Sequence, residues 1–264
     1  MTAPSTPSTA TPAVRLDRVA ESFSRSATTY EAHARVQQRV ASHALRSLTC
    51  KPADKVLDVG CGTGIHTAAL AARGAKVHGL DMADGMVALA ARRYPDIAFQ
   101  VGEAEAMPFQ TETFDWLFSS MALQWCASPL QALSECRRVL KPGGQAVLAI
   151  MVAGSFAELE QARRVAGLGR RSNPQASHEH WRQAALQAGF TVRDATQTAY
   201  TDTHPTLLDL LRSIRNTGAG VTASPGKSLT RQDLQKLAMT YRALNAKATG
   251  FPLTYRVSHL ILEK

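Results

Sequence analysis

The 264-residue sequence has little cysteine, few aromatic side chains and no long apolar run. Its four cysteines, at positions 50, 61, 126 and 136, form no CxxC pair and have no histidine neighbours at metal-ligand spacing. This pattern argues against a disulfide framework and a metal site, and predicts reduced, mostly buried thiols in a cytoplasmic protein. Because no stretch of about 18 apolar residues exists, we expect no membrane-spanning helix.

Charge is missing from the first thirteen residues, which are rich in Ser, Thr, Pro and Ala. This composition predicts a disordered tail over residues 1–13. The segment also lacks the basic start and apolar run of a secretory signal. We expect residues 14–264 to form a single domain. It would consist of N-terminal helices over 14–50, a core over 51–152, and substrate or lid elements with the last strands over 153–264.

The net charge of +9 is unevenly distributed along the chain. Residues 56–150 carry 7 basic and 9 acidic side chains, whereas residues 1–55 carry 8 and 4, and residues 151–264 carry 15 and 8. Basic flanks of this kind attract nucleic acids, acidic proteins or anionic small molecules. A solvated surface without a partner is the alternative.

Strand and helix patterns alternate through the middle of the sequence. Apolar strand patterns cover 55–59, 76–81, 97–102, 114–120 and 145–152, with helical spacing over 64–74, 83–94 and 129–140 and a turn over 141–144. This alternation predicts an α/β fold with a parallel, doubly wound sheet, whose strand-end loops share one edge.

The pattern is looser on both sides of this core. A helical segment over 23–45 precedes it, and helices over 156–167, 178–190, 206–218 and 229–247 follow, with strands over 191–200 and 251–264 and a loop over 219–228. Thr230 and Asp233 resemble a capping box at the start of one helix. The helices between the last two strands are candidate lid elements.

The stretch VLDVGCGTG places three glycines directly after the first strand. Gly60, Gly62 and Gly64 do not match the dinucleotide fingerprint, since its third glycine falls on Ile65. The acid just before the loop, Asp58, would repel a pyrophosphate. It favours a ligand with a positive group, such as S-adenosylmethionine, which carries an ammonium, a sulfonium and no phosphate.

Acidic residues also follow the next two strands. Asp81, which ends the second strand 21 residues after Gly60, can accept hydrogen bonds from both hydroxyls of a ribose. Enzymes that bind NAD use the same device, so Asp81 supports an adenosine ligand without selecting one. After the third strand, Glu103 can accept from an adenine amino group, and the Ala104 backbone can address the ring edge.

The motifs VLDVGCGTG, GLD, GEAEAMPF, FDWLFSS and RVLKPGG, over roughly residues 50–152, resemble the class I S-adenosylmethionine-dependent methyltransferases. The resemblance implies a Rossmann-like fold with a mainly parallel seven-stranded sheet and a helical lid. It implies S-adenosylmethionine as cofactor and S-adenosylhomocysteine as product. It also implies roles for single residues: Asp58, Gly60 and Gly62 at the methionine part, Asp81 at the ribose, Met82, Glu103 and Ala104 at the adenine, and Ser119 near the methyl group.

The flanking segments resemble a narrower family. FSRSATTYEAHARVQQ, ALQWCASP, LRSIRNTGAG and FPLTYRV, spread over most of residues 18–264, are similar to the biotin-pathway malonyl-acyl-carrier-protein O-methyltransferases. This resemblance implies that the acceptor is the free carboxylate of a malonyl thioester on an acidic acyl carrier protein, docked by the basic flanks. Methylation would mask this charge on the way to pimeloyl chains and biotin.

A carboxylate acceptor needs positioning rather than proton transfer. It is ionised at pH 7, so we expect no general base and no catalytic side chain in the acid–base sense. Arg212 and Arg215, three residues apart on one helix face, are candidates to hold it, and Ser213 can add a hydroxyl. Tyr30 and Trp125 are candidates for the acceptor pocket, and Gln37 for the cofactor's carboxylate. Ordinary core or surface roles remain the alternative for all six.

Three other functions stay open from the sequence. One is a methyltransferase for another small carboxylic acid. A second is a nucleic-acid methyltransferase, which only the basic flanks support, since no RNA-binding module or aromatic–basic pattern is present. A third is a protein that binds the cofactor without catalysis.

Overall fold

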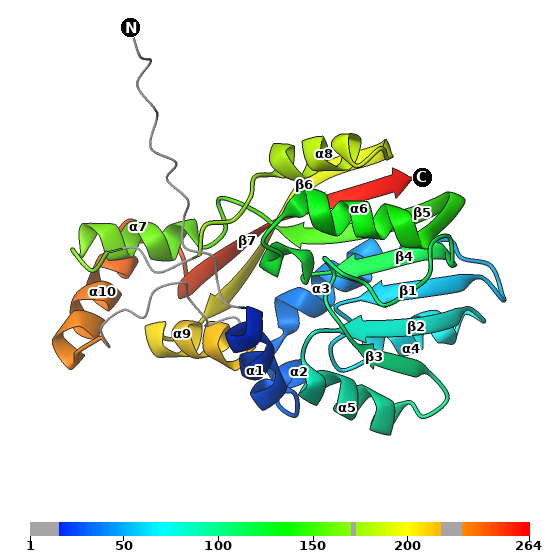
Figure 1. Ribbon diagram of the computed structural model, residues 1–264. Helices are drawn as coiled ribbons and strands as arrows, with labels where there is room; N and C mark the ends of the chain where they lie inside the picture. Colours follow the sequence, from blue (N-terminus) through cyan, green and yellow to red (C-terminus); the bar gives the residue numbers. More distant parts are fainter. Residues whose placement is uncertain (1–15, 170–172, 218–228) are drawn as a thin grey trace, which may run out of the picture.

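A computed structural model describes residues 16–169, 173–217 and 229–264 (Figure 1). The predicted tail over 1–13 and the predicted loop over 219–228 lie outside these residues. The described strands form one seven-stranded sheet in the order β3-β2-β1-β4-β5-β7-β6. Their bounds are β1 (Lys55–Val59), β2 (Lys76–Asp81), β3 (Ala98–Val101), β4 (Phe114–Ser120), β5 (Leu140–Met151), β6 (Thr191–His204) and β7 (Phe251–Glu263).

The sheet is mainly parallel, as the alternating pattern predicted. Strands β1 to β5 pair in parallel, and β7 runs antiparallel between β5 and β6. The strand order reverses after β1, because β2 lies on one side of it and β4 on the other. In a doubly wound sheet, ligands bind at the carboxyl ends of the strands at such a reversal. The topology therefore directs the search for a site to the ends of β1, β2 and β4.

Helices cover both faces of the sheet and extend beyond its carboxyl edge (Figure 1). One core lies beneath α3 and another beneath α6 and α8. The helices α7, α9 and α10 gather at the end of the sheet where β6 ends and β7 begins; α9 and α10 are the two helices between the last two strands. From residue 35 onward, the helices of the described chain are α3 (Arg35–Ala44), α4 (Ile65–Ala71), α5 (Asp84–Arg93), α6 (Pro129–Val139), α7 (Ala157–Val165), α8 (His178–Gln187), α9 (Leu207–Asn216) and α10 (Arg231–Leu244), with a short 3₁₀ helix η1 (Leu123–Trp125).

The N-terminal segment differs from the single helical stretch predicted over 23–45. It forms three helices, α1 (Leu16–Ser26), α2 (Tyr30–His33) and α3. Hydroxyls at the break bond backward to the backbone: Thr29 Oγ1 donates to the Ser26 carbonyl at 3.2 Å, and Ser26 Oγ contacts the Ser22 carbonyl at 3.1 Å. Such bonds compete with the continued helix ladder. The break lets α1 fold against α5, where Ser24 Oγ donates to Asp84 Oδ1 at 2.6 Å.

The turn predicted over 141–144 is instead part of β5. Phe114 of β4 pairs with Leu140, but Trp116 pairs with Gln145, so the extra residues form a bulge in the ladder. Gly143, with φ of +75°, takes the left-handed conformation inside this bulge. Strand β6 also continues to His204, beyond the predicted end at residue 200.

The capping box predicted at the start of α10 is confirmed. Asp233 N donates to Thr230 Oγ1 at 3.1 Å, and Thr230 N donates to Asp233 Oδ2 at 2.9 Å. In the described part of the chain, no helix is long and apolar enough to cross a membrane.

Candidate functional site

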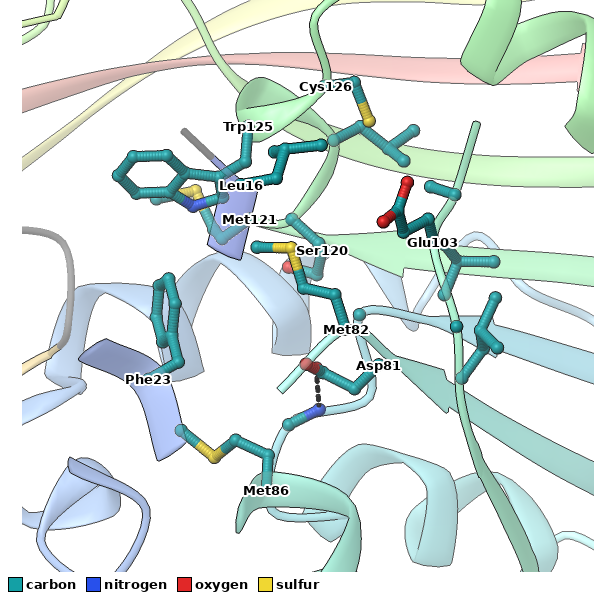
Figure 2. Close-up of a pocket in the computed structure, with 18 of the residues that line it drawn as sticks. Leu16, Phe23, Asp81, Met82, Met86, Glu103, Ser120, Met121, Trp125 and Cys126 are labelled. Atoms are coloured by element: carbon teal, nitrogen blue, oxygen red, sulfur yellow. Dashed lines mark hydrogen bonds between the residues drawn. The ribbon is translucent and has the colours of Figure 1, made fainter. Parts of the chain in front are cut away.

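A cavity lies at the carboxyl ends of β1, β2 and β4, where the topology directs the search (Figure 2). It holds about 740 Å³ of space, open solvent at its mouth included. Its lining comes from the loops after β1 to β4, from η1 and from the N-terminal helices. The residues discussed below that line it are Leu16, Phe23, Tyr30, Gly60, Gly62, Asp81, Met82, Met86, Glu103, Ala104, Glu105, Ser120, Met121, Trp125 and Cys126.

Two glycines of the loop after β1 line the cavity for different reasons. Gly60 has φ of +77°, and a Cβ there would lie 2.1 Å from Ala122 Cβ. This glycine lets the loop after β4 approach the loop after β1. Gly62 has φ of +55°, and a Cβ there would meet nothing within 4 Å. The second glycine therefore leaves open space for a ligand, whereas the first makes room for the protein itself.

Asp81 lines the cavity floor at the end of β2. Its Oδ2 accepts from Gly62 N at 2.8 Å, and its Oδ1 accepts from Ala83 N at 2.9 Å. Burial raises the pKa of this carboxyl, while backbone donors, Ala83 and Gly62 foremost, act in the opposite direction. A carboxylate has about four lone-pair sites, so two remain available. That number matches the two hydroxyls of a ribose.

Asp58 lies behind the glycine loop and is not among the cavity-lining residues. It is 2% exposed, and its Oδ2 accepts from Thr67 Oγ1 at 2.6 Å. Burial raises the pKa of this carboxyl to about 7, the Thr67 hydrogen bond opposes the shift, and the nearby Asp81 adds to it. Its ionisation is therefore sensitive to any positive charge brought into the cavity.

The two serines that end β4 point in different directions. Ser119 Oγ donates to the Val59 carbonyl at 2.8 Å, which ties β4 to β1 and leaves this hydroxyl outside the cavity lining. Ser120 lines the cavity, and its buried Oγ has no hydrogen-bond partner among the residues that the structure describes. Figure 2 shows Ser120 between Met82 and Met121. The sequence analysis placed Ser119 near the methyl group, but the structure shows that its neighbour Ser120 lines the cavity.

The cavity wall near the loops after β2, β3 and β4 contains both acidic and sulfur-containing side chains. Met82, Glu103 and Ala104 line it, as the resemblance implied for the adenine end. Glu105 was not predicted; its carboxylate accepts from Ala127 N at 3.0 Å and from Ser128 N at 2.8 Å, which joins the loops after β3 and η1. Further sulfur-bearing side chains on this wall, all missed from the sequence, are Met86, Met121 and Cys126.

Aromatic side chains from three elements cover the cavity. Phe23 of α1 packs edge-on against Trp125 of η1, with ring centroids 5.8 Å apart, and lies 6.3 Å from the Tyr30 ring of α2. Burial, followed by the charge of Asp81, raises the pKa of the Tyr30 phenol, which therefore stays protonated as a donor. Tyr30 and Trp125 were predicted here, whereas Phe23 and Leu16 were not. A periodic helix alone does not reveal which apolar residues face a cavity.

Besides Asp58 and Ser119, four further residues predicted for binding do not line this cavity. Gln37 lies on α3, and the other three lie on α9. Arg212 Nη1 is 3.4 Å from Asp209 Oδ1, and 58% of its side chain is exposed. Ser213 Oγ donates to the Leu210 carbonyl at 2.8 Å, and Arg215 is exposed. Helix α2, whose first residue Tyr30 lines the cavity, nevertheless contacts α9 at its other end, since Asn216 Nδ2 and His33 Nε2 are 3.3 Å apart.

The cavity suits an adenosine ligand that carries a positive group. It offers Asp81 with two free lone-pair sites, an open cradle at Gly62 and an unpartnered buried hydroxyl at Ser120. Among the described residues, no group of three His, Cys, Asp or Glu side chains is placed to hold a metal ion. These residues thus fit S-adenosylmethionine. The Rossmann-like sheet and this site together define a class I S-adenosylmethionine-dependent methyltransferase.

Comparison with known proteins agrees with this class and narrows it. Residues 57–148 match a family model described as a methyltransferase domain. The chain is 33% identical to the malonyl-[acyl-carrier protein] O-methyltransferase of Erwinia pyrifoliae over 254 residues, which cover 95% of this chain and 94% of that one. The chain belongs to the malonyl-acyl-carrier-protein O-methyltransferase family, so the resemblance seen in its sequence is confirmed.

Two further matches cover different shares of the proteins compared. The chain is 35% identical over 256 residues to the biotin biosynthesis bifunctional protein BioHC of Cellvibrio japonicus; the match covers 96% of this chain but only 51% of that protein. The chain thus spans about half the length of this relative. The geranyl diphosphate C-methyltransferase of Streptomyces coelicolor, solved with S-adenosylhomocysteine, shares the fold, with a TM-score of 0.54, 16% identity and coverage of 87% and 79% of the two chains.

Proposed function

We propose that this protein methylates the free carboxylate of a malonyl group carried by an acyl carrier protein, and so provides the methyl ester for pimeloyl synthesis in biotin biosynthesis. The observation that carries the proposal is the 33% identity, over nearly the whole of both chains, with a relative named for this reaction. The cavity supports it independently, because it offers polar partners for an adenosine and an aromatic cover for a small acceptor.

In the proposed reaction, the protein positions its ligands and excludes water. Bound S-adenosylmethionine supplies the methyl group, which passes to a carboxylate oxygen as the bond to sulfur breaks and its electron pair stays on sulfur. No proton moves, which is why no general base is required. Phe23, Tyr30 and Trp125 shield the reacting atoms from solvent, and the Tyr30 phenol donates a hydrogen bond.

We assign the cofactor contacts as follows. Asp81 accepts from the ribose, Met82, Glu103 and Ala104 surround the adenine, and Gly60 and Gly62 face the methionine part. Asp58 acts from behind the loop through its charge. Ser120 supplies the hydroxyl that the sequence had suggested for Ser119. Gln37 remains a candidate for the cofactor's carboxylate, although it does not line the cavity in the ligand-free protein.

Helix α9 is the proposed holder of the acceptor carboxylate. Arg212 and Arg215 lie on a helix that contacts α2 through Asn216 and His33. Their guanidinium groups are exposed, and a planar fork suits a carboxylate. Ser213 lies between them. Contact with the acceptor would require the Arg212 guanidinium to leave Asp209 and turn toward the cavity.

We further propose that residues 14–264 work as one domain, that the carrier protein is acidic, and that the enzyme acts in the cytoplasm. The net charge of +9 supports attraction to an acidic partner. The basic flanks are also the only feature that favours nucleic acid as a substrate.

The test is methyl transfer measured by mass spectrometry. Wild-type protein would be offered malonyl-carrier protein, malonyl-CoA, a set of free dicarboxylic acids and bulk RNA, with Asp81→Ala as the variant that binds cofactor poorly. We expect methyl ester on the malonyl thioesters, and little with Asp81→Ala. Transfer only to free acids or only to RNA would replace the proposed acceptor.

A further inference from the structure

A stripe of basic side chains runs along the exposed side of α3 and into the turn that follows it. Arg35, Arg39 and His43 are spaced by four residues, which places them on one helix face, and Arg46 comes two residues after the helix ends. The opposite face is apolar and packs into the core beneath the helix. Residues 32–53 contain no Asp or Glu, although the chain has 21 acidic residues in all. Core packing thus accounts for one side of α3 and leaves the cationic side unexplained.

A groove lies between this stripe and the edge strand β6, and hydrogen bonds link its floor to α3 and β7. Tyr200 of β6 lies in the floor, with its hydroxyl 2.5 Å from His43 Nδ1 and 2.9 Å from His259 Nε2. Arg39 spans the groove, since its Nη1 donates to the Thr201 carbonyl at 3.1 Å and its guanidinium lies over the Tyr200 ring. These contacts hold the groove open without using the charge of Arg35 or Arg46.

The charge of the groove is not neutralised within the protein. Across the described ranges, no carboxylate forms an ion pair with Arg35, Arg39 or Arg46. Arginines elsewhere do have glutamate partners, namely Arg93, Arg138, Arg182 and Arg193. Three uncompensated guanidinium groups along one groove create a local positive potential that attracts an anionic partner.

We propose that this groove docks an acidic helix of the carrier protein that presents the acceptor. This inference rests on the proposed function and adds to it the surface on which the carrier protein docks. From Arg35 to His43 the helical part of the stripe is about 12 Å long, at about 1.5 Å per helical residue. A helix with carboxylates every three or four residues presents charges at the same spacing. Guanidinium groups bind carboxylates through paired hydrogen bonds, which fixes the register of such a helix.

The position of the groove suits delivery to the cavity. Arg35 begins α3 only five residues after Tyr30, which lines the cavity. Five residues span at most about 18 Å even when fully extended, so one end of the groove lies close to the cavity wall. A flexible arm on a docked carrier would therefore have a short path to the aromatic cover.

The groove is less suited to a nucleic acid. Single strands bind to exposed aromatic rings on which bases stack. The aromatic residue of the groove, Tyr200, is only 7% exposed, and its ring faces the Arg39 guanidinium. The observations therefore favour a protein partner with surface carboxylates.

The test compares two acceptors that share the malonyl thioester, one on the carrier protein and one without it. Arg35→Glu/Arg46→Glu would be assayed with malonyl-carrier protein and with S-malonyl-pantetheine, which has neither carrier nor phosphate. Arg92→Glu/Lys76→Glu is the matched control, because it makes the same charge change at exposed positions on other elements. We expect kcat/KM for malonyl-carrier protein to fall at least tenfold, mainly through KM, while S-malonyl-pantetheine and the control change less than twofold. Arg35→Gln/Arg46→Gln should show a smaller loss of the same kind.

Each other outcome overturns the docking proposal. Equal losses on both acceptors would assign the arginines to folding or to the cavity, and an unchanged kcat/KM on the carrier would place docking elsewhere. Loss of RNA binding without loss of carrier methylation would assign the groove to nucleic acid. Wild-type methylation of both acceptors at equal kcat/KM would refute docking but keep the proposed function. Wild-type activity on neither thioester would refute the proposed function and the docking with it.

Discussion

The two halves of the cavity are held in different ways. On the cofactor side, polar groups are fixed by the protein itself: Asp81 and Glu105 each accept two backbone N–H bonds, and Asp58 accepts from Thr67. On the proposed acceptor side, the cover is made of ring contacts from separate helices, and Arg212, which does not line the cavity, is paired with Asp209 on its own helix. We infer that the cofactor half is organised before ligands arrive, whereas the acceptor half is completed by what it binds.

The largest expected effect, on both cofactor affinity and stability, comes from a substitution at Gly60 in the cofactor half of the cavity. Gly60→Ala would place a methyl group 2.1 Å from Ala122 Cβ in a left-handed backbone conformation, so the loops after β1 and β4 must separate. We expect at least a hundredfold loss of S-adenosylmethionine affinity, together with a fall in Tm. Calorimetry and thermal unfolding measure the two effects.

Gly62→Ala is the matched control within the same loop. Its Cβ would meet nothing within 4 Å, so the stability cost is limited to the left-handed conformation, about 1–2 kcal/mol. Affinity should still fall, because the new methyl group enters ligand space. Equal Tm losses in both variants would contradict the different roles assigned to the two glycines.

The next effect concerns the acceptor half. Arg212→Ala should lower kcat/KM for a malonyl thioester about ten- to a hundredfold, since a charge-assisted hydrogen bond contributes about 1.5–3 kcal/mol. Arg212→Lys should rescue poorly, because a point charge does not fix the carboxylate plane. S-adenosylmethionine affinity should hardly change. Kinetics and cofactor binding, measured for both variants and for Arg215→Ala, test this.

Two results would change this assignment. Near-wild-type turnover in Arg212→Ala would move the proposed grip to another residue, with Arg215 the next to examine. Collapse of cofactor binding would instead give Arg212 a role in supporting the organised half, and the contrast between the two halves would weaken.

The same contrast explains how far the sequence predicted the site. Strand alternation and acids at strand ends predicted the parallel sheet and placed Asp81, Glu103 and Ala104 at one edge, because topology alone brings such ends together. Ser119 and Ser120 could not be distinguished, since neighbours on a strand face opposite sides and the sequence does not reveal which side meets the cavity. Phe23 and Leu16 were missed because an amphipathic helix packs equally well on a core.

A moderate effect should appear as a pH dependence of cofactor affinity. In the ligand-free protein, the folded pKa of Asp58 is raised to about 7, so the neutral acid predominates below that pH. A raised carboxyl pKa contributes stability below the unfolded value, and this contribution is lost as pH rises through 7. A cationic ligand in the cavity favours the ionised form of the Asp58 carboxyl instead. S-adenosylmethionine affinity should therefore increase from pH 6 to pH 8, by up to about tenfold per unit below the pKa, and then level off.

Two comparisons isolate Asp58 in that titration. Asp58→Asn keeps the side-chain shape and an acceptor for Thr67 but cannot ionise, so its affinity should be weaker at pH 8 and nearly independent of pH. Methylthioadenosine, which has neither ammonium nor sulfonium, should bind wild-type protein with a flat profile. A pH dependence that survives in Asp58→Asn would assign it to Asp81 or to another group.

The smallest effect separates the two serines of β4, which differ only in the partner of their hydroxyl. Ser119→Ala removes a bond to the Val59 carbonyl and should lower unfolding free energy by about 0.5–1.5 kcal/mol, with affinity changed less than about twofold. Ser120→Ala removes a buried hydroxyl that has no partner among the described residues, so stability should stay equal or rise. Its cofactor affinity should instead fall about two- to tenfold, the value of one hydrogen bond.

The opposite directions of the expected stability and affinity changes in the two variants are more informative than the size of either change. A general disturbance of the end of β4 would lower stability and affinity together in both variants, because the two positions are adjacent on one strand. A hydroxyl held ready for a ligand costs stability while it has no partner and contributes to affinity once it is paired. Denaturant unfolding and calorimetry on the two single variants therefore decide whether Ser120 belongs to the organised half. If Ser120→Ala lowers stability and leaves affinity unchanged, its hydroxyl serves the strand and not the ligand.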